Sequence, residues 1–189
     1  PDMSPPLSAR MNPWLSIWLR PRATIQHIVD TDPQQQVTLI AVLIGIVYFL
    51  ENPLTTSLRV SLGFPLYPVL LIPAGAIVGL IGVHVGAMVV RWVGQRLGGR
   101  ASDVHLRAAL AWGQVPFVIG VITSAIAQMF LVRNPEVGSA AWLNQHPYAT
   151  GVLGAVSSLV LVAAIWGAFT YVKAVAQVQG FSAWRALLN

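Results

Sequence analysis

The chain has 189 residues, of which 56% are hydrophobic and only 9% are charged. A soluble globular domain carries about 25% charged residues, and a domain of this size could not bury so much apolar surface. The composition therefore excludes an ordinary water-soluble domain and predicts that lipid surrounds most of the chain. The sequence has no cysteine, which also excludes disulfides and thiolate metal sites.

Long apolar stretches with almost no charge indicate membrane spans. Lipid offers no hydrogen bonds to the backbone, so only helices or closed barrels cross a bilayer. Barrel strands read as segments of about 10 residues with alternating hydrophobicity, whereas these stretches are longer and continuous. The expected fold class is therefore all-α, a polytopic α-helical membrane bundle with four full spans in one domain, residues 12–189. The spans are expected near residues 34–52, 68–97, 103–133 and 148–179.

Residues 12–31 are expected to form two short amphipathic helices at the membrane interface, after a disordered tail or cloning remnant at residues 1–11. Tryptophan on an apolar face beside arginine suits a helix in the headgroup region. The alternative is that this face packs against the cytoplasmic end of the bundle, and both arrangements can hold together. The expected interface residues are Trp14, Trp18, Arg20 and Arg22.

The positive charges are sorted between alternate connections of the predicted spans. Nine of the eleven Lys and Arg residues lie in the N-terminal region, the second connection and the C-terminal end, and only Arg59 and Arg133 lie in the other two. By the positive-inside rule this bias predicts a cytoplasmic N-terminus. The net charge of +5 is scattered at span edges, so we expect it to attract anionic inner-leaflet lipids and not nucleic acid.

The second predicted span carries glycines at spacings of four, three and four residues, which place them in one stripe. Small residues in such a row let the backbone of another helix approach closely in a membrane. The stripe therefore predicts close helix packing, either within the chain or against a second copy or another membrane protein. Its members are Gly75, Gly79, Gly82 and Gly86.

His84 is the only ionisable residue deep within a predicted span, and such residues often mark a pathway or a proton relay. A neutral histidine bonded to a neighbouring helix is the alternative explanation. Gln114 lies beside Pro116, which should kink the third span, and Gln128 follows on the same span. Interhelical hydrogen bonds of about 0.6 kcal/mol each also account for these glutamines. The candidate polar pathway is His84, Gln114, Pro116 and Gln128.

No motif in the sequence indicates catalysis. The chain lacks the spacing of a nucleophile elbow or of a zinc protease site, and it lacks a glycine-rich phosphate loop. We therefore expect a protein that is not an enzyme and that uses no metal or cofactor.

Six short segments match the sequence pattern of a known membrane-protein family: NPWLSIW (12–18), RPR (20–22), TI (24–25), DTDP (30–33), ALAWGQVP (109–116) and VQGFSAWRAL (178–187). In these segments the chain resembles bacterial members of the Yip membrane family, which is named for eukaryotic members that interact with Ypt/Rab GTPases. The opening segments are fairly specific and the apolar middle is not. Together they extend the resemblance over nearly the whole chain from Met11.

The resemblance implies a five-span protein of the bacterial inner membrane with a cytoplasmic N-terminus. Four spans and the first turns of a fifth are recognisable, so either the chain has been shortened or this member ends early. Eukaryotic relatives act in vesicle traffic and membrane shaping. We therefore expect a non-enzymatic protein of membrane organisation, or a membrane adaptor, that acts through helix packing and cytoplasmic-face contacts. The alternative is a small transporter or channel component with a path between the second and third spans.

Overall fold

The structure is a computed structural model that describes residues 11–52, 55, 58, 61–62, 66–131 and 140–187. The side chains of residues 50, 51, 125–131 and 140 are not described, and Arg59, Arg133 and residues 1–10 of the expected tail lie outside the described residues. Every regular element in this part of the chain is a helix. The helices are α1 (Pro13–Leu19), α2 (Pro21–Thr31), α3 (Val37–Glu51), α5 (Leu66–Arg96), α6 (Asp103–Gly113), α7 (Val115–Leu131), α8 (Ala140–Gln145), α9 (Pro147–Gln179) and α10 (Ala183–Leu187).

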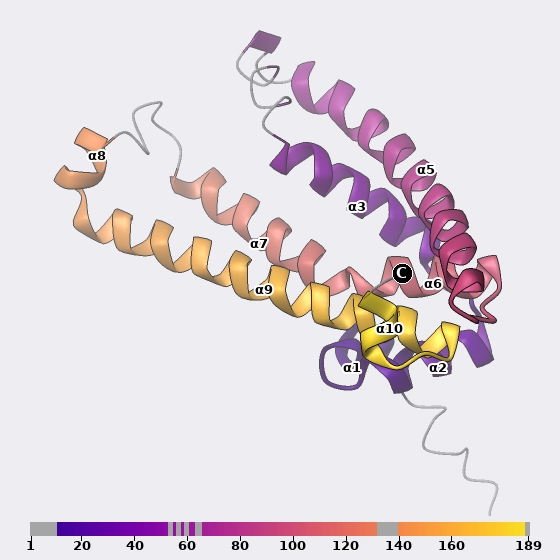
Figure 1. The fold of residues 1–189 in the computed structure, drawn as a ribbon. Coiled ribbons are helices and arrows are strands. Elements are labelled where there is room, and N and C mark those ends of the chain that lie inside the picture. The colour runs from indigo at the N-terminus through magenta and orange to yellow at the C-terminus, as the bar shows by residue number, and fades with distance from the viewer. Residues whose placement is uncertain are drawn as a thin grey trace, which may run out of the picture.

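Two arms diverge from a shared end of the molecule (Figure 1). One arm pairs α3 with α5 and the other pairs α7 with α9, each as antiparallel neighbours. The short helices α1, α2 and α10 gather where the two arms meet, with α2 packed against α6 and α9, and α10 packed against α9. We call these three short helices, together with Arg20 and residues 96–102, the platform.

Among the described residues, three helical segments are long and apolar enough to cross a membrane: Leu66–Arg96, Asp103–Ser124 and Pro147–Gln179. The prediction of four full spans is therefore only partly met, because α3 has 15 residues. A bilayer core requires about 20 helical residues. The helix is short because Gln36 has a φ of 55°, a left-handed conformation that does not continue a helix.

The third predicted span consists of two helices. Helix α6 ends at Gly113 and helix α7 begins at Val115, with Gln114 between them. Pro116 has no backbone N–H to donate to the preceding turn, and its ring crowds the carbonyl group four residues earlier. The backbone N–H of Gln114 instead donates to the carbonyl oxygen of Ala111 at 3.2 Å, which makes a tight turn of the 3₁₀ type.

The main core lies at the shared end of the arms. Ile17, Ile25 and Ile28, on the apolar faces of α1 and α2, are 0% exposed. They pack in one cluster with Trp112 of α6, which is also fully buried. The N-terminal helices therefore turn their apolar faces into the bundle, as in the second of the two arrangements that the sequence left open.

Helices α5 and α9 keep most of their apolar side chains on the outside. In the most apolar stretches of α5 and α9, only 22% and 11% of the residues are buried, against 61% in Asp103–Ser124. Such surfaces far exceed the exposed apolar patches of soluble monomers. Lipid hydrocarbon is a suitable environment for these surfaces, because each helix satisfies the hydrogen bonds of its own backbone.

Candidate functional site

Two backbones approach closely where α3 crosses α5. A Cβ atom added to Gly79 would collide with the carbonyl oxygen of Ala41, and one added to Gly45 would collide with the carbonyl oxygen of Gly75. The helix that faces this part of the glycine stripe is therefore α3 of the same chain. Sequence reasoning did not single out Gly45, although its spacing of four from Ala41 is the same small-residue signal.

The other two glycines of the stripe lie apart from this contact. No atom lies within 4 Å of a Cβ added to Gly82. A Cβ added to Gly86 would lie 3.4 Å from Cδ1 of Leu110, which is an ordinary contact. Both glycines line a cavity of about 310 Å³ between α3, α5, α6 and α9. The stripe therefore belongs to two surfaces, a helix contact and a cavity wall.

His84 joins α5 to α6. Its Nε2 lies 3.0 Å from Nη1 of Arg107, and its Nδ1 lies 2.8 Å from the carbonyl oxygen of Leu80. A guanidinium group can only donate, so Nε2 accepts and the ring hydrogen lies on Nδ1, which donates to Leu80. Both ring nitrogens therefore have partners, one on the neighbouring helix and one on the same helix.

The other residues of the candidate polar pathway do not join His84. The side-chain amide of Gln114 donates to a backbone carbonyl of α6 at 3.1 Å. Gln114 lines the cavity of about 310 Å³, whereas His84 lines a different cavity of about 60 Å³. Pro116 is fully buried, and the side chain of Gln128 lies outside the described residues. The structure therefore does not bring His84 and Gln114 into one cavity.

Of the four expected interface residues, the two tryptophans make contacts within the protein. The ring of Trp14 meets the ring of Trp112 edge-on, with centroids 5.0 Å apart. The carbonyl oxygen of Trp18 accepts a hydrogen bond from Nε1 of Trp166 at 3.0 Å. The exposed members of the set are Arg20 and Arg22.

Other apolar residues occupy the outer surface of the platform. Leu15 and Leu19, four residues apart on α1, are 70% and 84% exposed. On α10, Trp184 and Leu187 are 80% and 58% exposed. Sequence reasoning missed these residues because α1 is apolar on both faces, so its pattern does not say which face turns inward.

The described cations gather at the platform end of the molecule. All eight lie on the platform or on the parts of α5, α6 and α9 that adjoin it (Figure 1). Three aspartates also lie there, and one of them, Asp103, forms an ion pair with Arg91 at 2.5 Å. This end therefore carries an excess of positive charge. The eight cations are Arg20, Arg22, Arg91, Arg96, Arg100, Arg107, Lys173 and Arg185.

A buried glutamine holds the end of α9 against the end of α5. Gln179 is 3% exposed, and its Nε2 donates to the carbonyl oxygen of Val90 at 3.2 Å. Its Oε1 accepts from the backbone N–H of Ala101 at 3.5 Å. The glutamine fits because a Cβ atom on Gly94 or Gly99 would collide with it. Gln179 therefore fixes the connection that follows α5.

Replacing Gln179 with alanine should loosen the platform. The change leaves two buried backbone groups without this partner, which costs about 1–3 kcal/mol. We expect a lower midpoint of thermal unfolding in detergent and faster hydrogen exchange at residues 97–102. Gln177→Ala is the matched control, because Gln177 bonds to the exposed Gln26 at 2.9 Å and its loss should cost less than about 0.5 kcal/mol. Equal effects of the two substitutions would contradict this role of Gln179.

Long apolar helices in two arms, with positive charge gathered at one end, define a multi-pass α-helical membrane protein. The residues that the structure describes contain no group of three His, Cys, Asp or Glu side chains that could hold a metal ion. The chain belongs to the Yip1 domain family, whose model matches residues 15–189. The family assignment made from the sequence motifs is thereby confirmed. Comparisons with curated proteins and with solved structures found no match.

Proposed function

We propose that this protein is a non-enzymatic membrane organiser whose platform gathers anionic lipids and offers contacts to adaptor partners. The proposal includes the orientation: the platform faces the cytoplasm at a bacterial inner membrane. The observation that carries it is the gathering of all eight described cations at one end of the molecule.

The charge of the platform end favours an anionic lipid surface. Each Lys or Arg near such a surface contributes about 1 kcal/mol of attraction. Arg91 is largely committed to Asp103, but other arginines point to solvent. Arg96 also lies over the ring of Trp92, 4.6 Å from its centroid, a pairing that suits the boundary between headgroups and hydrocarbon. The exposed arginines are Arg20, Arg22, Arg96, Arg100 and Arg185.

Exposed apolar side chains on the platform support the same function. Leu15 and Leu19 are exposed on α1, which the exposed Arg20 directly follows. Trp184 and Leu187 are exposed on α10, which carries the exposed Arg185. Helices with apolar and basic residues side by side bind at the headgroup boundary of anionic membranes. The same side chains are suitable contacts for a partner protein at that surface.

Neutralising exposed arginines should weaken lipid gathering. The protein is reconstituted into giant vesicles of phosphatidylcholine with a minor fraction of fluorescent phosphatidylglycerol. We expect phosphatidylglycerol to be enriched around the unaltered protein. The combined variant Arg96→Gln, Arg100→Gln and Arg185→Gln should reduce this enrichment several-fold, because it removes three charges of about 1 kcal/mol each.

The matched control keeps the charge. Arg96→Lys, Arg100→Lys and Arg185→Lys together should leave the enrichment close to that of the unaltered protein. High salt should weaken the enrichment in both, since salt screens exposed charges. If the glutamine variant still enriches phosphatidylglycerol as the unaltered protein does, the platform arginines do not gather anionic lipid and the proposal is wrong.

The transporter alternative has no comparable support, because His84 and Gln114 line separate cavities. A flux assay in liposomes distinguishes the two functions. Solute flux that His84→Ala abolishes, with an unchanged thermal unfolding midpoint, would favour the transporter and contradict the proposal.

A further inference from the structure

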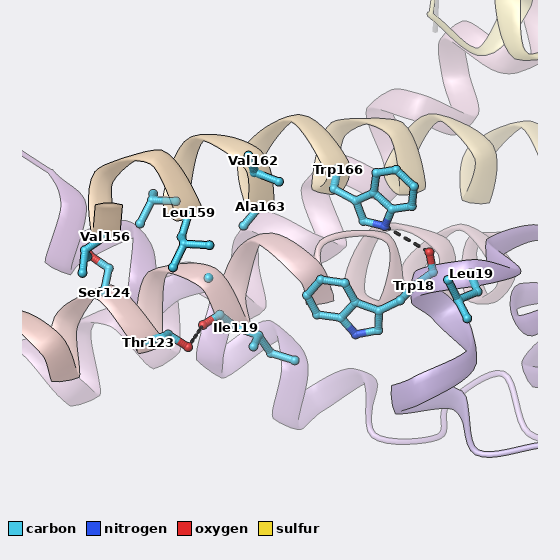
Figure 2. Close-up of a pocket in the computed structure, with 12 residues that line it drawn as sticks. Trp18, Leu19, Ile119, Thr123, Ser124, Val156, Leu159, Val162, Ala163 and Trp166 are labelled. Carbon is cyan, nitrogen blue, oxygen red and sulfur yellow. Dashed lines mark hydrogen bonds between the residues drawn. The ribbon is translucent and has the colours of Figure 1, made fainter. Parts of the chain in front are cut away.

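An apolar groove runs along one face of the α7/α9 arm (Figure 2). Its volume is about 510 Å³, and side chains of α7 and α9 form its walls. Trp18 and Leu19 of α1 stand at one end of the groove beside Trp166, and Val156 and Ser124 stand at the other end. The groove is therefore elongated along the arm, and it begins beside the platform.

Small residues on the floor create the groove. Gly120 of α7 faces Ala163 of α9 so closely that a Cβ added to Gly120 would collide with Cβ of Ala163. Larger side chains such as Ile119 and Leu159 then line the space beside this contact. The result is a shallow groove with apolar sides.

Two polar groups that line the groove have hydrogen-bond partners within the protein. The hydroxyl group of Thr123 donates to the carbonyl oxygen of Ile119 at 2.8 Å, within its own helix. Nε1 of Trp166 donates to the carbonyl oxygen of Trp18 at 3.0 Å. Neither group is available for a polar ligand, so the groove suits hydrocarbon.

The end of the groove beside α1 carries positive charge. Nζ of Lys173 lies 4.0 Å from the centroid of the Phe169 ring, and that ring lies 5.4 Å from the ring of Trp166. Arg20 is exposed and directly follows Leu19, which lines the same end. An apolar body with a cationic mouth is complementary to an anionic amphiphile.

The length of the groove matches one leaflet. Val156 precedes Trp166 by ten residues, which is about 15 Å along a helix. Half of the hydrocarbon core of a bilayer is also about 15 Å. We propose that one acyl chain of an anionic phospholipid lies in this groove, with the headgroup phosphate at Arg20 and Lys173. A second copy of the chain, inserted in the same orientation, would instead bring further positive charge to the mouth.

Native mass spectrometry of the purified protein in detergent tests the site, with phosphatidylglycerol or phosphatidylcholine added. We expect one phosphatidylglycerol to be retained per chain, in preference to phosphatidylcholine. Leu159→Trp should fill the groove and lower retention about tenfold, a loss of about 1.4 kcal/mol. Leu161→Trp is the matched control: Leu161 is 61% exposed against 64% for Leu159, but it does not line the groove.

A second pair of variants tests the mouth. Arg20→Gln with Lys173→Gln should abolish the preference for phosphatidylglycerol while phosphatidylcholine is still retained. The platform variant Arg96→Gln, Arg100→Gln and Arg185→Gln should keep the preference. The lipid site in the groove and the lipid gathering by the platform can therefore be contradicted independently. The first is measured by the retention of a single lipid, and the second by lipid enrichment in a vesicle.

Three results would overturn the inference. One is equal lipid retention by Leu159→Trp and Leu161→Trp, when thermal unfolding shows that both are folded. Another is a dimer that Leu159→Trp converts to a monomer, because a second copy would then fill the groove. The third is equal retention of the two lipids by the unaltered protein, which would show that the cationic end of the groove does not recognise the lipid headgroup.

Discussion

Gly79→Ala should destabilise the protein by about 3 kcal/mol, although it adds a single methyl group. The new Cβ atom would meet the carbonyl oxygen of Ala41 and would lie 2.8 Å from the backbone nitrogen of Gly45. Both are backbone atoms of α3, so no side chain can turn aside to make room. The two helices must separate, and the contact that defines this arm is lost over its length. The midpoint of thermal unfolding in detergent measures the loss.

Gly82→Ala is the matched control for this prediction. It makes the same change three residues further along the same helix, where no atom lies within 4 Å of the added Cβ. Alanine favours a helix over glycine by about 0.8–1 kcal/mol, so the unfolding midpoint should stay the same or rise slightly. If both variants unfold alike, the close approach of α3 and α5 is wrong.

Trp112→Ala should cost about 3–5 kcal/mol, the usual range for removing a large buried aromatic side chain. Trp112 is 0% exposed. Its Nε1 donates to the carbonyl oxygen of Gln35 at 3.0 Å, and its ring meets that of Trp14. The side chain thus links α6 both to α1 and to the turn before α3. Without it, we expect α1 and α2 to leave the bundle, with faster hydrogen exchange over residues 13–31.

Trp112→Phe and Trp14→Phe separate the contributions of this cluster. Phenylalanine at position 112 keeps much of the packing but loses the hydrogen bond to Gln35. The free energy of unfolding of Trp112→Phe should therefore lie between those of the unaltered protein and Trp112→Ala. Trp14 donates to the exposed Gln36 at 2.6 Å, where water can replace the bond, and Trp14→Phe should cost less than about 1 kcal/mol. Unchanged exchange of α1 in Trp112→Ala would contradict the link.

Much of the fold was readable from local patterns. Apolar stretches without charge predicted helices and a membrane environment, and the segments around Trp14 and Trp184 led to the family that the comparison confirms. The break after Gly113 followed from the missing N–H of Pro116. The length of α3 was overestimated, because the left-handed conformation of Gln36 has no signal in a residue that is not glycine.

The candidate sites depended on tertiary structure to a greater degree. The glycine stripe predicted a helix contact, but only the crossing of α3 over α5 separates Gly79, where an added Cβ would collide with α3, from Gly82, where no atom lies within 4 Å of an added Cβ. His84 lies on α5 and Gln114 lies between α6 and α7, and their placement in different cavities depends on how α5 and α6 cross. The side chain of Gln128 lies outside the described residues and stays untested.

The sequence by itself determined the solvent of this protein, the helical class and the family, because hydrophobicity, charge and proline act locally along the chain. Only the tertiary structure decided which face of α1 is buried and where the α7/α9 groove lies. Both depend on residues such as Ile17, Gly120 and Ala163, whose neighbours come from distant parts of the chain. A pattern within one helix records that a residue is small or apolar, but the helix that packs against it fixes whether that residue meets protein, lipid or a cavity.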